Sequence, residues 1–438
     1  MARALSPTLL TALLSLHALV SRVPAQELSS YDKQRGRMML DQVKSDIKDN
    51  YYDPSFHGVD LDAAFKAAEE KLKNAKSNGQ IMGIIAQTLV ALNDSHTFFL
   101  PPSRKAAVDY GWEMQLFGDS ALVTRVKEKS DAEAKGLKVG DAVLSVDGYL
   151  PARANLWQLL YLYYALRPQP GMHLTVQSPG GAPREFDVLA KVEDRRSLDL
   201  SSFSNMFDMV REGEKAERER KRSHRRQELG DALVWKMPRF NLTPDEVNAH
   251  MGEASKHKAL ILDLRGNSGG AEDTMLSLLG NLFERELKVG DIRRRKEVKP
   301  LVAKSRGEKA FKGQLVVLVD SRSASAAELL ARVVQIEKRG KVVGDRTAGA
   351  VMRSRSYSHE VGLNGIAFYG TSVTDADIVM ADGKRLEGAG VTPDEVLFPT
   401  GADLAAGRDP ALARAAALVG VTLFPEKAGA LFPEPKKN

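Results

Sequence analysis

The sequence predicts a multidomain protein of mixed α+β and α/β class, and three regional patterns support that prediction. Apolar residues recur at helical spacing between residues 26 and 105. Short alternating strands separated by glycine turns fill residues 106–192, and near-continuous apolar strands alternate with helices between residues 231 and 400. At about 150 residues per domain, 438 residues give two or three domains with cores of their own.

The composition is that of an ordinary globular protein. Hydrophobic residues make up 43% and charged residues 27% of the chain, and 63 lysines and arginines against 57 acidic residues leave a net charge of only +6. Cysteine is absent. Its absence excludes disulfide scaffolds, cysteine-based zinc sites, iron–sulfur clusters and thiol nucleophiles.

Residues 1–25 are predicted to be a signal peptide. Met1–Arg3 provides a short positive start, Leu5–Val20 is mainly apolar, and Val23–Ala25 supplies small residues where a signal peptidase cuts. We therefore expect an exported protein, periplasmic or secreted, that matures near Gln26; a retained N-terminal anchor is the alternative. No later stretch approaches the roughly 20 apolar residues needed to cross a bilayer, so no stable membrane insertion is expected after signal removal.

Residues 26–105 are predicted to be a helical region that ends in a polar loop. Apolar side chains recur at spacings of three and four, as in Met39, Val43 and Ile47. The loop places Asn-Asp-Ser-His, residues 93–96, between apolar flanks.

Residues 106–192 are predicted to form a small domain of short strands. The run Gly136–Gly148 reads Gly-Leu-x-x-Gly-Asp, then a valine-rich strand and an Asp-Gly turn, and it resembles a PDZ domain. That resemblance implies a domain that binds an extended peptide at a sheet edge and holds its carboxylate in a loop of backbone amides. The implied peptide-binding loop comprises Tyr110, Gly111, Trp112, Glu113 and Met114.

Residues 193–230 are predicted to be a charged linker. The run Arg211–Arg226 mixes eight basic residues with four glutamates. Nucleic-acid binding is one interpretation, but no aromatic platform accompanies the charges, so a solvated helix face with i,i+4 ion pairs is favoured and no nucleic-acid partner is expected. The basic cluster Arg293–Lys296 is interpreted in the same way.

Residues 231–400 are predicted to form an α/β core. Lys258–Leu264 and Gln314–Val319 have the apolar composition of strands buried on both faces, and helices are expected over Thr274–Leu282 and Ala324–Glu337. A third strand at Lys341–Val343 completes βαβ units, which implies a parallel sheet with right-handed crossovers. Residues 401–438 are expected to add a C-terminal helix and tail.

Two loops of this core carry candidate chemistry. Val319–Glu328 has the strand, turn and helix layout that can present a nucleophilic serine beside unpaired amides, although serines at a helix start also serve as simple caps. Asp263–Gly270 ends in a glycine pair whose amides could face an anion, or could form a turn with no ligand. This segment matches neither dinucleotide-binding nor Walker patterns, so no nucleotide cofactor is expected.

The order of four motifs is more specific than any one of them. Asp-Leu-Arg-x-Asn-x-Gly-Gly at 263–270, Ser-Ala-Ser-Ala-x-Glu at 323–328, Val-Gly-Asp-x-Thr at 343–347 and Glu-Gly-Ala-Gly-Val-Thr-Pro-Asp at 387–394 follow the PDZ-like region. This order resembles the tail-specific (C-terminal processing) serine peptidases and their tricorn-core relatives. The resemblance implies a crotonase-like α/β peptidase core with an inserted PDZ domain and an N-terminal helical region.

The resemblance also implies site residues. The nucleophile falls on Ser325, and the oxyanion hole on the amide of Ala326 together with that of Gly269 or Gly270. The processing branch uses a lysine base at the position occupied here by Ala350, and an alanine cannot accept a proton.

The tricorn-like branch instead uses a histidine in a Ser-His dipeptide and a distant glutamate before a Gly-Val motif. This sequence has both, which assigns His96 as general base and then acid. Ser95 and Glu387 would orient the imidazole or stabilise its charge.

The function predicted from these residues is that of an exported serine endopeptidase that cleaves polypeptides through an acyl-enzyme. His57, His250, His257 and His359 show no metal-ligand spacing, so neither a metal nor another cofactor is expected. Two alternatives remain open: a pseudo-peptidase that binds peptides without cutting them, and a non-proteolytic ligand-binding relative. The oligomeric state is not indicated by the sequence.

Overall fold

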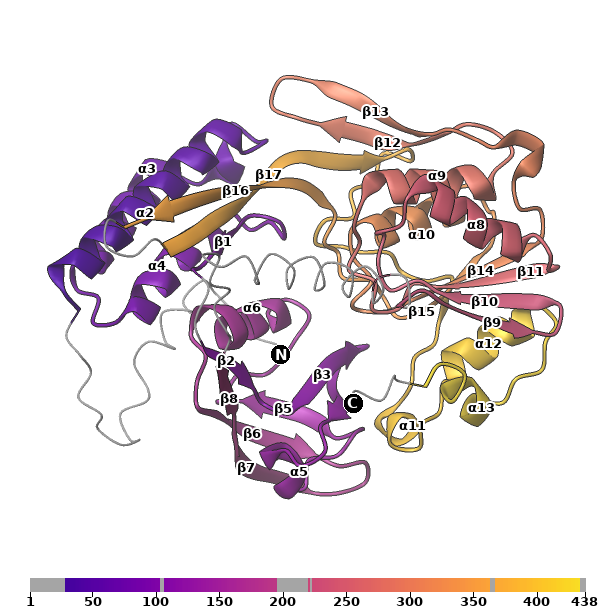
Figure 1. Ribbon diagram of the computed structural model, residues 1–438, viewed down its shortest axis with the longest axis horizontal. Helices are drawn as coiled ribbons and strands as arrows, with labels where there is room; N and C mark the ends of the chain where they lie inside the picture. Colours follow the sequence, from indigo (N-terminus) through magenta and orange to yellow (C-terminus); the bar gives the residue numbers. More distant parts are fainter. Residues whose placement is uncertain (1–27, 103–105, 195–219, 221–222, 363–366, 434–438) are drawn as a thin grey trace, which may run out of the picture.

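The computed structural model describes residues 28–102, 106–194, 220, 223–362 and 367–433 (Figure 1). The predicted signal peptide and most of the Arg211–Arg226 run lie outside these ranges. Among the helices that are described, none combines the length and the apolar character that a bilayer crossing requires.

The N-terminal region is helical, as predicted. Its helices begin at side-chain caps supplied by Ser29, Asp60 and Ser77, each accepting from a backbone amide of the first turn. Their apolar faces pack on one another and on the short strand that follows. The elements are α2 (Ser30–Asn50), the single turn η1 (Phe56–Gly58), α3 (Leu61–Lys73), α4 (Asn78–Val90) and strand β1 (Phe98–Leu100).

Residues 106–194 form a separate antiparallel unit with its own apolar core. Five strands pair in chain order, β3-β4-β5-β6-β7, and the two end strands β2 and β8 pair with each other. The strands are β2 (Ala106–Asp109), β3 (Trp112–Phe117), β4 (Ser120–Val126), β5 (Ala142–Val146), β6 (Gly171–Gln177), β7 (Pro183–Leu189) and β8 (Lys191–Asp194). Helix α5 (Asp131–Ala134), helix α6 (Leu156–Tyr161) and the turn η2 (Leu162–Leu166) complete the unit.

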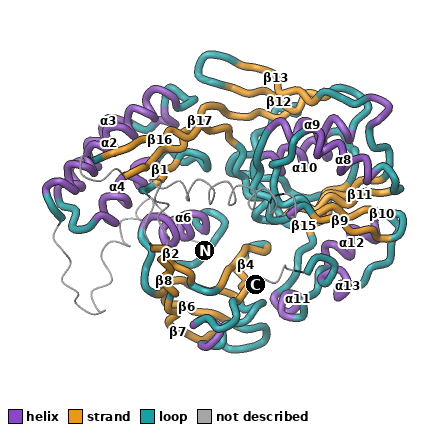
Figure 2. Tube along the Cα trace, viewed as in Figure 1, coloured by secondary structure: helices purple, strands orange, loops and turns teal. Residues whose placement is uncertain are grey.

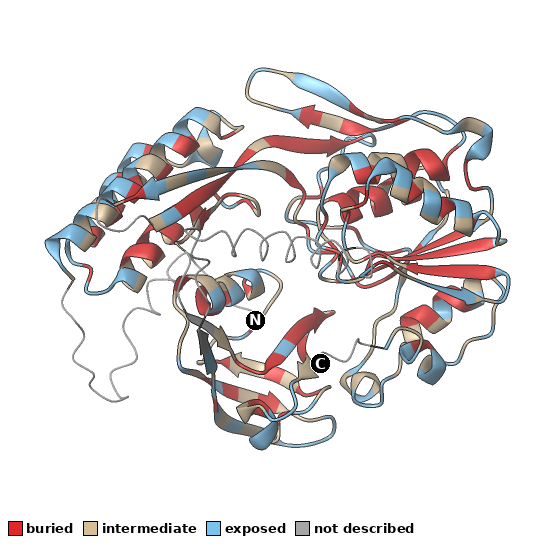
Figure 3. Cartoon of the chain, in the orientation of Figure 1, coloured by how far each residue is buried: buried red, intermediate tan, exposed pale blue. Residues whose placement is uncertain are grey.

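The main core is a six-stranded sheet in the order β18-β15-β14-β11-β10-β9, parallel except for the edge strand β9. Alternate residues of its central strands face opposite sides. One set packs against the helices between residues 244 and 336, and the other set packs against the helices that follow residue 410. Figures 1 and 3 show these helices on the two sides of the sheet. The strands are β9 (Arg225–Leu229), β10 (Ala232–Lys236), β11 (Ala259–Asp263), β14 (Gln314–Val319), β15 (Lys341–Gly344) and β18 (Glu395–Val396). The helices are α8 (Pro244–Ala254), α9 (Glu272–Leu282), α10 (Ala326–Ile336), α11 (Gly401–Ala405), α12 (Pro410–Leu418) and α13 (Pro425–Gly429).

A second sheet joins this core to the N-terminal helices. Strand β17 pairs at one end with β1 and at the other with β12, and it forms a long hairpin with β16 (Figure 2). The register sets Phe98 opposite Ser372, so the loop before β1 lies against the middle of β17. Its strands are β12 (Leu287–Arg293), β13 (Val298–Ala303), β16 (Met352–Val361) and β17 (Ala367–Met380), and the turn η3 (Gly307–Lys309) follows β13.

The predicted parallel strands and the helices that connect them are confirmed, with ends shifted by a few residues. One expectation was wrong. Arg225 and Arg226 belong to strand β9, so the core sheet begins inside the segment predicted as a linker, and these two arginines are not on a helix face. The antiparallel sheet formed by β12, β13, β16 and β17 was not predicted at all.

Candidate active site

Ser325 lies at the turn between β14 and α10, where its backbone takes φ 55° and ψ −119°. Few residues other than glycine adopt such a conformation, and where one does at a strand-to-helix turn the side chain is projected away from the chain. Within the described residues the Ser325 hydroxyl donates no hydrogen bond, and its oxygen caps the first turn of α10. Ser323, by contrast, is fully buried and its hydroxyl donates to the Leu264 carbonyl at 2.8 Å, so it supports the turn.

The glycine pair lies against this serine. A Cβ on Gly269, which has φ 91°, would come within 2.7 Å of the Ser325 Cβ, so only glycine fits. The Gly269 amide donates to the Asn267 side chain at 2.8 Å and is therefore engaged. The amides of Gly270 and Ala326 have no partner among the described residues, which favours Gly270 over Gly269 for the predicted oxyanion hole.

One carboxylate fixes both loops relative to each other. Asp320 Oδ1 accepts from the Gly266 amide at 2.9 Å, in the glycine loop, and from the Arg322 amide at 3.0 Å, in the serine turn. Its other oxygen accepts from the Gln115 side chain at 2.7 Å. The serine turn, the glycine loop and strand β3 therefore meet at one buried group.

The predicted His96, Ser95 and Glu387 are brought together although 291 residues separate His96 from Glu387 (387 − 96). The Ser95 hydroxyl lies 2.7 Å from His96 Nδ1 and 3.0 Å from a Glu387 carboxylate oxygen, while the Ser95 amide donates to the other oxygen at 2.8 Å. Burial lowers the pKa of His96, and burial raises the pKa of Glu387. A low imidazole pKa keeps the ring neutral, as a general base requires.

The residues around position 350 connect these two groups. The Ser325 amide donates to the Ala350 carbonyl at 2.9 Å, and the next amide, that of Val351, donates to Glu387 at 2.7 Å. The loop of Ala350 and Val351 thus contacts both Ser325 and Glu387, the carboxylate that bonds to Ser95. The Ser325 hydroxyl and the imidazole are not hydrogen-bonded to each other, which is common in active sites without substrate.

Sequence reasoning missed Glu328, which lies in the first turn of α10. It is fully buried, and its two oxygens accept from the amides of Ser325, Gly349 and Ala350 at 3.0, 2.8 and 2.9 Å and from the Thr347 hydroxyl. Burial raises the pKa of Glu328 to about 7. A glutamate three residues after a helix-capping serine was the available signal, because such a side chain reaches back to the cap.

The five residues of the predicted peptide-binding loop have different environments. Tyr110, Trp112 and Met114 point into the apolar core of the 106–194 unit, and Glu113 is ion-paired with Arg125 at 2.8 Å. The Gly111 amide donates to the Asp109 side chain at 2.9 Å, so one amide of that loop already faces a carboxylate.

Strand β3 directly approaches the nucleophile turn. The Arg322 side chain donates to the Met114 carbonyl at 2.7 Å, and the Ser321 hydroxyl donates to the Leu116 carbonyl. From Met114 onward, this turn therefore covers the outer edge of β3. Among the described residues, the turn makes no such contact with the part of the edge before Met114.

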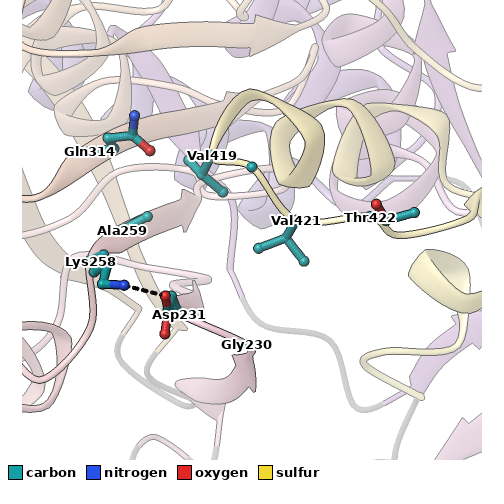
Figure 4. A pocket seen from close by; sticks show the side chains of 9 residues that line it. Gly230, Asp231, Lys258, Ala259, Gln314, Val419, Val421 and Thr422 are labelled. Atoms are coloured by element: carbon teal, nitrogen blue, oxygen red, sulfur yellow. Dashed lines mark hydrogen bonds and ion pairs between the residues drawn. The ribbon is translucent and has the colours of Figure 1, made fainter.

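An open pocket of about 500 Å³ lies elsewhere, where β10, β11 and β14 begin (Figure 4). Its lining includes Asp231 and Lys258, which are ion-paired at 2.7 Å, and Gln314. Ser325 and Gly269 follow the opposite, carboxyl ends of these strands, where open α/β sheets bind their ligands. The pocket therefore lies at the opposite end of the sheet from the candidate site. In the described part of the chain, no three histidine or carboxylate side chains gather so that they could hold a metal ion.

A serine on a strained turn, free amides beside it and an imidazole linked to a carboxylate are the groups that serine hydrolases combine. Comparison with known proteins leads to the same class. A model of peptidase family S41 matches residues 232–397, and a model of the tricorn protease C1 domain matches residues 32–85.

Among curated relatives, a chloroplastic C-terminal processing peptidase of Tetradesmus obliquus is 26% identical over 376 residues, which span 80% of this chain and 74% of the relative. A tail-specific protease of Haemophilus influenzae is 31% identical over 350 residues, spanning 76% of this chain and 47% of the relative. The chain thus covers about three quarters of the first relative and about half of the second.

The structure of mature CPAF complexed with lactacystin has a TM-score of 0.63 at 16% identity, covering 86% of this chain and 96% of that one, and it shows the same fold. Together these matches show that residues 232–397 form a domain of peptidase family S41, whose C-terminal processing and tail-specific members are serine peptidases.

Proposed function

We propose that this protein is a serine endopeptidase that uses Ser325 as nucleophile and His96 as base. The observation that carries the proposal is the chain of contacts from Glu387 through Ser95 to His96, joined by the loop of Ala350 and Val351 to the backbone of Ser325. Ala350 leaves no lysine in this loop, and the imidazole supplies the missing base.

The reaction would proceed by acyl transfer. His96 Nε2 takes the Ser325 hydroxyl proton while Oγ attacks the scissile carbonyl, and the amides of Ala326 and Gly270 bind the oxyanion. The imidazolium then gives its proton to the leaving amine as the C–N bond breaks. A water molecule, deprotonated by His96 in turn, hydrolyses the ester and regenerates Ser325.

Labelling with a fluorophosphonate tests this proposal, because that reagent acylates only an activated serine. The wild-type chain from Gln26 onward is expected to be labelled at pH 7.5, and the Ser325→Ala variant is expected to show no labelling. Ser323→Ala is the matched control and should keep its labelling, because the buried Ser323 hydroxyl bonds to Asp320 and to the Leu264 carbonyl and is not the proposed nucleophile. An unlabelled wild type would overturn the proposal and favour the pseudo-peptidase alternative.

We further propose that the 106–194 unit is a PDZ domain inserted in a crotonase-like core, and that it receives a polypeptide segment at the outer edge of β3. One support is that Trp112, on the outer edge of β3, makes no backbone hydrogen bond outside its own sheet among the described residues. The other is an apolar stripe on α6 and η2, where the large side chains of Trp157, Leu160 and Tyr164 remain exposed. Tyr164 meets Tyr110, at the start of β3, with ring centroids 5.4 Å apart.

The Trp157→Ala variant is expected to bind a fluorescent peptide with an apolar C-terminus about tenfold more weakly, because loss of one aromatic anchor removes about 1.4 kcal/mol or more. Fluorescence anisotropy measures the affinity. Phe368→Ala, which removes a more exposed aromatic side chain on β17, is expected to change nothing. Equal binding by both variants would show that the α6 stripe does not contact the peptide.

We place the mature protein outside the cytoplasm, in a periplasmic or secreted location. The support is the pattern of residues 1–25 in the sequence, with its basic start, apolar stretch and Val23–Ala25 cleavage site. Polypeptides in that compartment would be the substrates.

A further inference from the structure

Asp94 determines the backbone position of the proposed base. It lies between α4 and β1, and its Oδ1 accepts from the amides of His96 and Thr97 at 2.9 and 2.7 Å. The same oxygen accepts from the Thr374 hydroxyl of β17 at 2.7 Å. Two carboxylates therefore hold the Ser95–His96 dipeptide. Asp94 accepts from the amides of His96 and Thr97, and Glu387 accepts from the amide of Ser95.

The second oxygen of Asp94 is buried and has no well-aligned hydrogen bond in the described chain, although the Tyr51 hydroxyl lies close enough to interact with this carboxylate. Asp94 is only 9% exposed, and no lysine or arginine of the described residues forms an ion pair with it. Burying half a carboxylate in this way is costly. An asparagine would make the same Oδ1 contacts at a lower cost, because a buried amide group carries no charge, so hydrogen bonding to the loop does not by itself explain a carboxylate here.

We propose that Asp94 is a positioning residue whose negative charge also stabilises the His96 imidazolium that forms when Ser325 attacks. This inference rests on the proposed function. It assigns Asp94 a role that Glu387 cannot fill alone, since Glu387 reaches the imidazole only through the Ser95 hydroxyl. Burial lowers the pKa of His96, and the Asp94 carboxylate opposes that effect by raising it.

The other groups that face this loop differ from Asp94 in their contacts or in their charge. Glu387, from the segment after β17, reaches the imidazole only through the Ser95 hydroxyl, and burial raises its pKa. Tyr51 and Tyr52, at the end of α2, have pKa values raised by burial and stay neutral. Strand β17 contributes the uncharged Ser372 and Thr374, and the serine turn contributes Ser325.

The test is an NMR titration of the histidine Cε1 protons in the full-length protein, with the His96 signal assigned by its loss in His96→Ala. In Asp94→Asn, which keeps the Oδ1 acceptor, the pKa of His96 is expected to fall by about half a unit or more. The acid limb of kcat/KM should move to lower pH by the same amount, and kcat/KM at pH 7.5 should fall about tenfold.

Thr374→Val is the matched control, because it removes a hydrogen bond to the same oxygen and leaves the charge. It is expected to lower Tm without moving the His96 pKa. An unchanged His96 pKa in Asp94→Asn would overturn the inference. The titration does not depend on turnover, so an inactive wild type would contradict the proposed function and leave the effect of Asp94 measurable.

Discussion

The His96→Ala variant is expected to hydrolyse peptides about four orders of magnitude more slowly than the wild type in kcat/KM, because Ser325 would then have no base. The imidazole is the one titratable group that the Ser95–Glu387 pair orients, through the 2.7 Å contact to Nδ1. Residue 350 is an alanine and offers no substitute. Removal of His96 should therefore be as damaging as removal of Ser325 itself.

The pH profile distinguishes this base from any other. His96 acts when neutral, and burial lowers its pKa below the ordinary 6.5. Activity should therefore be flat above neutral pH and fall on acidification with a midpoint below 6.5.

The matched control is His173→Ala, which removes an exposed histidine paired with Asp187 in the 106–194 unit. It should retain full activity. If His96→Ala cleaved peptides at the wild-type rate, another base would have to be sought and the assignment of the tricorn-like set would be wrong.

The sequence was informative about the fold wherever one pattern dominated a segment. The strands at Ala259–Asp263 and Gln314–Val319 are apolar except for Asp263 and Gln314 at their ends, because both faces are covered, so they were predicted directly. Strand β16 is largely exposed on one side and polar along its length. It pairs with β17, and β17 pairs with β1, which lies about 270 residues earlier in the chain. The hydrophobic periodicity of a segment does not indicate which distant strand it pairs with.

The candidate site could likewise be predicted from the sequence only in part. Ser325, His96 and Glu387 lie in motifs whose order resembles a known family, so they could be named from the sequence. The choice between Gly269 and Gly270 depends on where the Asn267 side chain donates and accepts, which no motif encodes. Glu328 resembled an ordinary first-turn glutamate, and three of its four contacts come from a loop about twenty residues further along the chain.

Replacing Glu328 with alanine is expected to lower the unfolding free energy by about 4 kcal/mol and kcat/KM by about 100-fold. The amides of Gly349 and Ala350 and the Thr347 hydroxyl would lose their acceptor, and each unsatisfied buried donor costs roughly 1–3 kcal/mol. The same loop fixes Ser325 through the Ala350 carbonyl, so the nucleophile would lose its alignment.

Urea unfolding and peptide hydrolysis at pH 7.5 measure the two effects. Glu337→Ala, at the far end of the same helix, is the matched control, since its carboxylate pairs with Arg285 near the surface. That variant should lose less than about 1 kcal/mol and no activity. A Glu328→Ala protein as stable and active as the wild type would show that the network around Thr347 and Ala350 contributes nothing to the site.

The charge of Glu328 has a separate signature. Burial raises its pKa from the ordinary 4.5 to about 7, so the folded state holds this proton more tightly than the unfolded state does. The resulting contribution to stability is present below pH 4.5 and is lost as the pH rises through 7, by about 3 kcal/mol at 1.36 kcal/mol per unit. Glu328→Gln cannot ionise, so the unfolding free energy of this variant should change less than that of the wild type between pH 5 and pH 8. Equal pH dependence in the two proteins would mean that Glu328 is already ionised at pH 5 and that its four donors outweigh its burial.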